Sequence, residues 1–352
     1  MKIRLLAAVA ALSACLQLFA APQRVIFDTD MGNDVDDALA LAMLYGYASE
    51  GEADIAAILI SKDSPYSAEF VGIMNCRYGF EIPVGIAGKG IVSIVGGSPD
   101  GTYAPPVCDL KNPDGSFKYP RNIMHGAKLM DSVKLARKVL AQSEDGSVVY
   151  ISVGFSTNIA AILRSEPDDI SPLSGRELMA KKIKYFSVMG GQYETSKNAP
   201  KVNREFNVFA DASSAKFFLE NPPAPVFLSG FEVGMELGFP NDAALSGFLP
   251  DSPVGLAYKH YCGYKDGKFS IVDTRLWDLT SVLFAFSPEY FDVSEIGTVE
   301  VGKGEITKFT PDDSGRCRYL KIPQGTERKI VDELVRRTLF LERKFFTFCR
   351  TP

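Results

Sequence analysis

Five aspartates lie within ten residues of the stretch FDTDMGNDVDDALAL, which runs from Phe27 to Leu41. They are Asp28, Asp30, Asp34, Asp36 and Asp37. Two unit charges about 4 Å apart repel by roughly 4 kcal/mol at an effective dielectric of about 20. Carboxylate oxygens without histidine or cysteine are the ligands that hard cations such as Ca²⁺ and Mg²⁺ prefer. The stretch therefore predicts a site at which a cation offsets the carboxylate charge.

Simpler interpretations cover only part of this stretch. Helix capping explains Asp34 or Asp36, because the N-terminal end of a helix favours negative charge, but it does not explain all five residues. An EF-hand does not fit, since Gly32 takes the fifth place counted from Asp28, a strand precedes the loop and no glutamate ends it. A phosphatase of the haloacid dehalogenase type would use Asp28 as nucleophile with Mg²⁺, but the Gly-Asp-x-x-x-Asp motif that it requires is absent from the sequence.

Apolar runs alternate with helical patterns along most of the chain. Buried strands are predicted at 24–30, 54–61, 82–88, 147–154, 184–191 and 225–230, and helices at 36–49, 65–79, 126–142, 156–164, 211–220, 253–264, 275–286 and 327–346. This alternation predicts an α/β fold with an open, mostly parallel central sheet and helices on both faces. A small antiparallel appendage is expected at about 291–322, and the irregular stretch 89–121 is expected to be a flap or an insertion.

The first 22 residues have the layout of a secretory signal, with Lys2 and Arg4 before a short apolar run. The sequence LSAC, ending at Cys15, resembles a bacterial lipobox, which predicts cleavage before Cys15 and a lipid anchor; cleavage near Ala21 is the alternative. Residues 23–352 then form a single domain. We expect an exported protein that is periplasmic or secreted. If Cys15 carries a lipid, we expect a membrane-anchored lipoprotein.

The composition favours a small, neutral partner. The net charge is −5, and lysine and arginine form no long run, so no basic stripe indicates a nucleic acid partner. Beyond Cys15 the five remaining cysteines form no CxxC pair, so free thiols are expected. The sequence is compatible with a homo-oligomer as well as with a monomer.

Several motifs in order resemble one family. DTDMGNDVDDALAL is similar to the signature of the inosine-uridine preferring nucleoside hydrolases, and VGFSTNIA (153–160), VMGG (188–191), EFNVFAD (205–211) and WDLTSVL (277–283) resemble later elements of that family. The matches run from about residue 24 to 286. The resemblance implies a Rossmann-like nucleoside hydrolase fold. It also implies Ca²⁺-dependent hydrolysis of the N-glycosidic bond of ribonucleosides, which gives ribose and a free nucleobase.

Carried over to this chain, the resemblance assigns roles to individual residues. It implies that Ca²⁺ is held by Asp30, Asp37, Asp278 and the main-chain carbonyl of Thr157, and that Asp30 activates a water bound to the ion. Asp36, Glu205 and Asn207 would bind the ribose hydroxyls, and Met189 would line the sugar pocket. Asp28 would orient its neighbours.

The sequence also departs from the family. Trp277 stands where many members have a histidine before the last metal aspartate, so it is either a stacking wall or core, and His260 or a nearby tyrosine is the alternative proton donor. Asp63, in SKDSPY, stands where the family commonly has Gly-Asn, and is either a polar contact or a helix cap. Because GNDVDD is longer than the usual motif, Asp34 and Asp36 could exchange roles.

These departures leave two alternatives to a nucleoside hydrolase. One is a hydrolase of another ribosyl or sugar compound. The other is a noncatalytic protein that binds a sugar through Ca²⁺.

Overall fold

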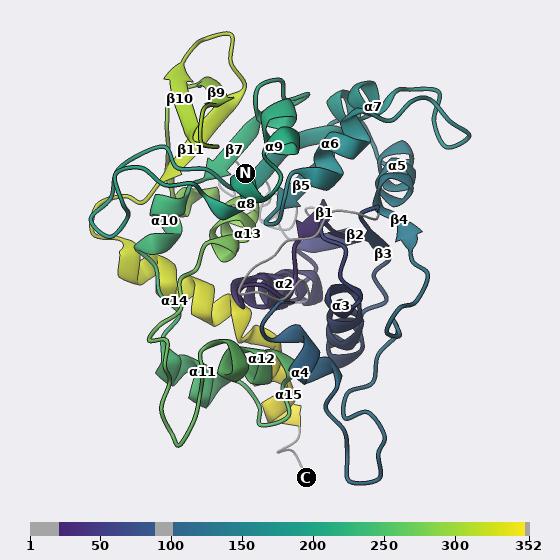
Figure 1. Cartoon of the computed structure of the whole chain (residues 1–352), viewed down its shortest axis with the longest axis vertical. Coiled ribbons are helices and arrows are strands. Elements are labelled where there is room, and N and C mark those ends of the chain that lie inside the picture. The colour runs from purple at the N-terminus through teal and green to yellow at the C-terminus, as the bar shows by residue number, and fades with distance from the viewer. Residues whose placement is uncertain (1–20, 89–100, 349–352) are drawn as a thin grey trace, which may run out of the picture.

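The computed structural model of the chain describes residues 21–88 and 101–348. Within these ranges a single sheet of 11 strands has the order β10-β9-β11-β7-β6-β5-β1-β2-β3-β4, with β8 paired to β11 (Figure 1). The strands are β1 (Gln23–Thr29), β2 (Ala53–Ile60), β3 (Val84–Ile86), β4 (Met130–Asp131), β5 (Val148–Ser152), β6 (Ile183–Met189), β7 (Val226–Ser229), β8 (Asp292–Val293), β9 (Gly297–Val301), β10 (Thr307–Pro311) and β11 (Cys317–Lys321). All pairs from β4 to β7 along the sheet are parallel, which confirms the predicted fold class.

The strand order reverses beside β1. The chain proceeds from β1 through β2 and β3 to β4 in one direction, and then returns to place β5 on the other side of β1. Asp28 is in register with Leu59 of β2 and with Ser152 of β5, so the three strands end at the same edge. In open α/β sheets, ligands bind outside the carboxyl ends of the strands at such a reversal point.

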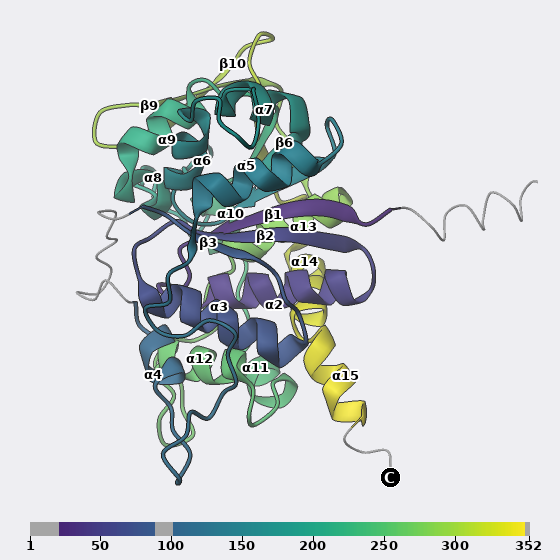
Figure 2. The ribbon, with the colours of Figure 1, turned by 90° about the vertical axis from the view of Figure 1, so that its right-hand side faces the viewer.

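Helices cover both faces of the sheet. The long ones are α2 (Asp36–Ser49), α3 (Pro65–Tyr78), α5 (Ser132–Gln142), α12 (Pro253–Tyr261), α13 (Asp278–Phe286), α14 (Glu327–Thr338) and α15 (Phe340–Phe348). Shorter ones are α4 (Ala104–Cys108), α6 (Thr157–Leu163), α7 (Gly175–Lys182), α8 (Phe206–Ala210), α9 (Ala212–Leu219), α10 (Phe231–Met235) and α11 (Asn241–Gly247). Figure 2 shows α5, α6 and α9 on one side of β1 and β2, and α2 and α3 on the other.

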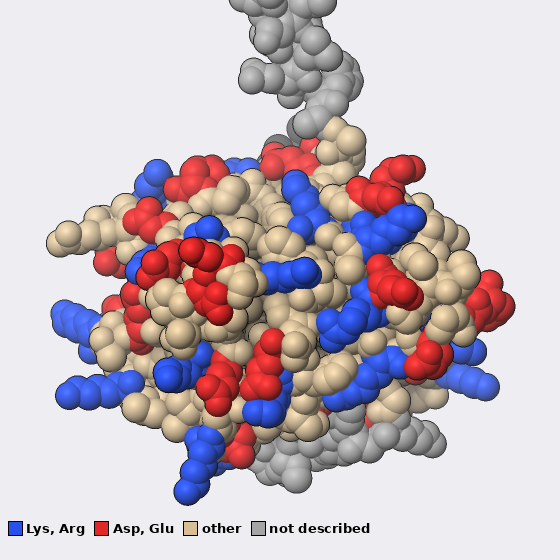
Figure 3. Space-filling view, turned by 90° about the horizontal axis from the view of Figure 1, so that it is seen from above, with Lys and Arg blue, Asp and Glu red and all other residues tan. Residues whose placement is uncertain are grey.

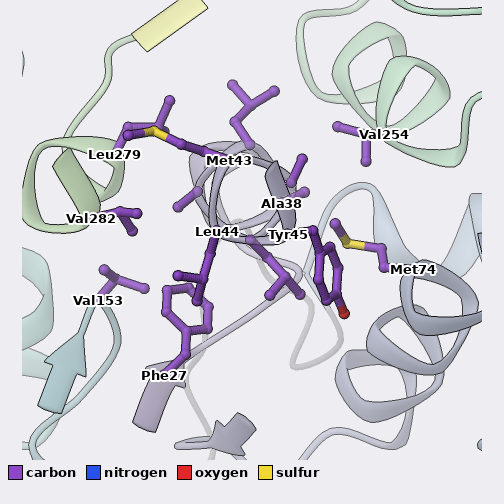
Figure 4. Close-up of a cluster of buried hydrophobic side chains, with 14 of the residues drawn as sticks. Phe27, Ala38, Met43, Leu44, Tyr45, Met74, Val153, Val254, Leu279 and Val282 are labelled. Carbon is purple, nitrogen blue, oxygen red and sulfur yellow. The ribbon is translucent and has the colours of Figure 1, made fainter. Parts of the chain in front are cut away.

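Helix α2 lies inside the protein rather than on its surface. Its first 12 residues are all buried, because the sequence DDALALAMLYGY is apolar on every side after the two aspartates. Figure 4 shows α2 residues surrounded by side chains from several elements, including Phe27, Met74, Val254, Leu279 and Val282. Tight packing on all sides fixes the position of the first turn of α2, which carries Asp36 and Asp37.

Several predicted boundaries shift. The helix expected from 126 begins at Ser132, because Asp131 accepts a hydrogen bond from the amide of Lys134 and caps it there. The helix expected at 327–346 is divided into α14 and α15 at Leu339. The antiparallel strands at the C-terminal end are confirmed, but β11 also pairs in parallel with β7, so they continue the main sheet. Of the stretch 89–121, residues 89–100 lie outside the described residues, and α4 follows them.

The predicted signal segment up to residue 20, with Cys15, also lies outside the described residues, so export and lipidation stay predictions. No helix in the described ranges has the length and apolar character needed to cross a membrane. Cys76, Cys108, Cys262 and Cys317 are free thiols. Figure 3 shows positive and negative side chains interspersed on the face that it presents.

The close approach of β5 to β1 can be tested at Gly154. A Cβ at this position would lie 2.4 Å from Oγ of Ser61 and 2.5 Å from the backbone nitrogen of Asp30. We expect Gly154→Ala to lower the free energy of unfolding by about 1–3 kcal/mol, measured in urea, because the packed strand ends cannot separate without strain. The control is Gly302→Ala, whose Cβ would meet nothing closer than 3.6 Å. Equal stability of the two variants would contradict the packing described for this edge.

Candidate active site

A cavity of about 230 Å³ opens at the carboxyl edge of the sheet. Its walls come from consecutive strand ends: Asp30 follows β1, Val153 follows β5, Met189 ends β6, and Phe231 lies just beyond β7. The remaining lining residues are Asn33, Asp34, Asp36, Asp37, Glu205, Phe206, Asn207, Trp277 and Asp278. The site therefore lies at the reversal point of the strand order.

The loop between β1 and α2 is held by the segment before α4. Gly32 adopts φ +113°, a value that glycine reaches without strain. Its amide donates to the hydroxyl oxygen of Tyr103 over 2.9 Å, and its carbonyl accepts from the amide of Thr102 over 2.9 Å. These contacts fix the backbone that carries Asp30 and Asn33.

Asp36 joins the beginnings of two helices. Its Oδ2 accepts hydrogen bonds from the backbone amides of Trp277 and Asp278, both over 3.1 Å. The N-terminal end of α13 is thereby held against the N-terminal end of α2, which places Asp278 in the same cavity as Asp37. Asp37 in turn accepts a hydrogen bond from the hydroxyl of Thr29.

Burial and mutual repulsion raise the pKa values of these carboxyls. Burial is the main cause in each case; it raises the pKa of Asp30 to about 6 and that of Asp36 to about 8. The pKa values of Asp37 and Asp278 lie well above the ordinary value, first through burial and then through neighbouring carboxylates. Burial and neighbouring carboxylates thus oppose ionisation of the acidic groups at this cavity.

The residue types at the cavity suit a hard cation. Asp30, Asp37 and Asp278 supply only carboxylate oxygens to one cavity. In the described parts of the chain, no three side chains of His, Cys, Asp or Glu form a metal-binding arrangement. The side chain of Thr157 donates to Asp211 over 2.6 Å, and Thr157 is not among the cavity-lining residues, so its carbonyl as a ligand stays a prediction.

The polar group opposite the aspartates comes from the start of α8. Glu205 caps this helix: Oε1 accepts from the amide of Asn207 over 2.8 Å, and Oε2 accepts from the amide of Gly191 over 2.9 Å. Its pKa rises to about 7 because it is buried. Nδ2 of Asn207 donates to the carbonyl of Val153 over 2.9 Å. Both side chains are buried at the cavity with Met189 rather than exposed on a loop.

An aromatic wall closes another side of the cavity. Trp277 stacks on Phe231 with the ring centroids 5.5 Å apart and the planes 24° from parallel. The indole Nε1 donates to the carbonyl of Phe231 over 3.1 Å, which fixes the ring orientation. Trp277 lines the cavity and also packs against the hydrophobic core, so its role as a stacking wall stays a prediction.

Tyr261, rather than His260, reaches the site from α12. Its hydroxyl donates to Oδ1 of Asp34 over 2.9 Å, whereas His260 is exposed and does not line the cavity. Asp34 therefore lies at the cavity with its own partner and is distinct from Asp36, which contacts α13.

Four predicted residues do not line the cavity: Thr157 and His260, described above, and Asp28 and Asp63. Asp28 is fully buried beneath it and accepts from the hydroxyl of Tyr150 over 2.6 Å and from Nδ2 of Asn158 over 2.9 Å. It therefore ties β1 to β5 and α6, and this position excludes it as an accessible nucleophile. Asp63 lines a separate cavity. The prediction that it caps α3 is wrong, because Ser64 takes the cap position and no side chain makes the capping bond.

The sequence analysis did not predict that Asn33, Val153, Phe206 and Phe231 line the cavity, or that Lys62 is buried. Asn33 lies within the aspartate motif and Phe231 follows a strand end, so position alone could have indicated both.

Comparison with known proteins shows a family match that covers the residues lining the cavity. The model of the inosine-uridine preferring nucleoside hydrolase family matches residues 25–328, a range that includes every cavity-lining residue. The chain belongs to this family. The family resemblance of the five sequence motifs is thereby confirmed.

Individual family members are distant in sequence. An inosine-uridine preferring nucleoside hydrolase from Leishmania major is 26% identical over 202 residues, which are 55% of this chain and 56% of that protein. The match thus spans little more than half of that relative's length.

Solved structures show the shared fold. A purine-preferring ribonucleoside hydrolase from Gardnerella vaginalis has a TM-score of 0.68 at 17% identity, over 91% of this chain and 99% of that one. A plant nucleoside hydrolase has a TM-score of 0.67 at 17% identity, over 90% of this chain and 99% of that one.

The raised pKa values predict how pH affects stability when a chelator is present. Folding raises the pKa of Asp30 to about 6 and that of Asp36 to about 8, so the folded state binds protons that the unfolded state releases. This contribution to stability is complete below the ordinary aspartate pKa and is lost as the pH rises through 6 and then 8. We expect the unfolding temperature in chelator to fall over that range, and added Ca²⁺ to reverse the fall at pH 8. A fall of equal size with Ca²⁺ present would contradict this account.

Proposed function

We propose that the protein is a Ca²⁺-dependent nucleoside hydrolase that releases a free nucleobase and ribose from ribonucleosides. The observation that carries the proposal is the meeting of Asp30, Asp37 and Asp278 with Glu205 and Asn207 at one cavity of a family member. One set can hold a hard cation and the other can bind vicinal hydroxyls. Both requirements must be met within a few ångströms for an N-ribosidic bond to be cleaved.

The cation would be held by Asp30, Asp37 and Asp278, together with the carbonyl of Thr157. When bound, a Ca²⁺ ion would lower the pKa of water and offset the carboxylate charge in the cavity. A carboxylate-only set agrees with Ca²⁺ or Mg²⁺ rather than with a softer metal, and family membership favours Ca²⁺.

Asp30 is the proposed general base. Its Oδ2 accepts from the Asn33 amide, which fixes the orientation of the carboxylate at the cavity wall. A fixed carboxylate can take a proton from a water molecule that attacks the anomeric carbon. In the transition state the bond to the base breaks as the water adds, so the sugar gains oxocarbenium character that nearby negative charge stabilises; the base leaves with the bonding electron pair and takes its proton from solvent, while the proton of the water passes to Asp30.

The sugar would be oriented from two sides. Asp36 uses Oδ2 for the start of α13, so Oδ1 is the atom that we assign to a ribose hydroxyl. Nδ2 of Asn207 is held by the Val153 carbonyl, which assigns its Oδ1 to a second hydroxyl. Charge-assisted hydrogen bonds to carboxylates such as Glu205 are stronger than neutral ones and hold the substrate more firmly.

The nucleobase would lie against Trp277. Its ring, backed by Phe231, offers a flat apolar surface on which a base can stack. Tyr261 is a poor proton donor, because burial raises the pKa of its hydroxyl far above the ordinary value. Help to the leaving group is therefore assigned to stacking rather than to a histidine.

Asp30→Asn is the direct test of this function. At saturating Ca²⁺ we expect it to lower kcat for base release by at least about 100-fold, because the variant keeps the shape of the base but cannot accept a proton. Its affinity for Ca²⁺ should also fall, since Asp30 is a proposed ligand of the ion. The assay measures free base and ribose from inosine, adenosine, uridine and cytidine, with and without chelator. Asp63→Asn is the matched control and should retain full activity, since Asp63 lines a different cavity.

The same assay separates the alternatives. No base release by the Ca²⁺-loaded protein from any nucleoside would contradict the proposal. Release of ribose from another ribosyl compound would then favour a different substrate, and sugar binding without turnover would favour a noncatalytic protein.

A further inference from the structure

Lys62 brings a positive charge to the carboxyl edge of the sheet. It lies two residues beyond the end of β2, and its side chain is fully buried. Its Nζ donates to Oδ1 of Asn33 over 2.8 Å. Asn33 is 3% exposed and lines the cavity, and its Nδ2 donates to Oδ2 of Asp30. A chain of two hydrogen bonds therefore connects a buried ammonium to the proposed general base.

The chemistry of the three groups permits only one direction for this chain. An ammonium can only donate, an ionised carboxylate can only accept, and an amide does both. Rotating the Asn33 amide by 180° would place its NH₂ group against Lys62 and its oxygen against Asp30. Both contacts would then be repulsive, so Lys62 and Asp30 act together to determine which end of the amide faces Asp30.

Lys62 also acts on the charge of the site. Burial raises the pKa of Asp30, and the Lys62 ammonium is the largest of the influences that oppose this rise. The same ammonium opposes the rise at Asp37. The aspartates thus face a resident positive charge in addition to any bound cation.

We propose that Lys62 is a positioning residue for the hydrolytic reaction: it orients the Asn33 amide so that this amide holds the carboxylate of Asp30 ready to accept a proton. This inference rests on the proposed function and adds a residue to it. The competing role for Lys62 is a counter-charge that only makes the acidic cavity tolerable. The two roles differ in what happens when Ca²⁺ supplies the positive charge.

The experiment compares Lys62→Met, Asn33→Ala and the double variant, all loaded with Ca²⁺. Methionine keeps much of the length of lysine without its charge. The measurements are kcat and KM for base release, and the Ca²⁺ dissociation constant by calorimetry. Lys182→Met is the matched control, because Lys182 donates to the carbonyl of Ser143 over 2.7 Å and lies before the amino end of β6, at the opposite edge of the sheet.

A positioning role predicts a specific pattern. In Lys62→Met, kcat falls by about 10- to 100-fold, the usual cost of losing an outer partner of a site residue. The KM changes little, and Ca²⁺ binds at least as tightly as to wild type because a positive charge has been removed. The kcat of the double variant is no lower than that of the less active single variant, since both substitutions break the same chain of hydrogen bonds.

Three results would overturn the inference while leaving the proposed function intact. The first is an unchanged kcat in Ca²⁺-loaded Lys62→Met, which would indicate a counter-charge only. The second is a decrease in the Ca²⁺ affinity of Lys62→Met that is as large as its decrease in kcat. The third is a fold-decrease in kcat of the double variant equal to the product of the fold-decreases of the two single variants. Should Lys62→Met fail to fold, Asn33→Ala tests the inference alone, and an unchanged kcat in that variant would overturn it. Absence of base release by wild type would overturn the proposed function and this inference together.

Discussion

The burial of several mutually repelling carboxylates at one cavity is the constraint on which the rest of this structure depends. Asp30, Asp36, Asp37 and Asp278 line one cavity, and none is more than 5% exposed. At an effective dielectric of about 20, each close pair of ionised groups costs roughly 4 kcal/mol at about 4 Å. A protein keeps such a cluster only if the surrounding fold holds the groups in place and something positive compensates their charge.

The fold provides the holding part of this requirement. Strands β1, β5 and β6 end at one edge, α2 is packed on all sides, and Asp36 bonds the first amides of α13. Three of these carboxylates are hydrogen-bonded by the protein: Asp36 by backbone amides, Asp30 by Asn33 and Asp37 by Thr29. Lys62 adds a positive charge through Asn33. The remaining charge is what a bound cation would offset.

The sequence was sufficient for the parts of the site that depend on local pattern. The apolar strands, the buried helix after Asp36 and the aspartate motif all follow from residue types at fixed spacing, and the ordered motifs led to the correct family. Contacts between distant segments were not accessible in this way. The bond from Tyr261 to Asp34, the stacking of Phe231 on Trp277 and the burial of Lys62 each join segments whose proximity only the tertiary fold determines. A helix cap, one of the two roles left open for Asp63, is wrong because a polar residue before a helix resembles a cap whether or not its side chain turns back.

The most direct test of this account is the stoichiometry of Ca²⁺ binding, measured by calorimetry on the chelator-treated protein at pH 8. The account predicts one ion per chain for wild type, and loss of that ion in Asp278→Asn, because Asp278 comes from a distant segment and yet lines the same cavity as Asp30 and Asp37. Asp28→Asn should still bind one ion, since Asp28 lies outside the cavity and bonds Tyr150 and Asn158. Wild-type protein that binds no Ca²⁺, or an Asp278→Asn variant that binds it as tightly as wild type, would contradict the account.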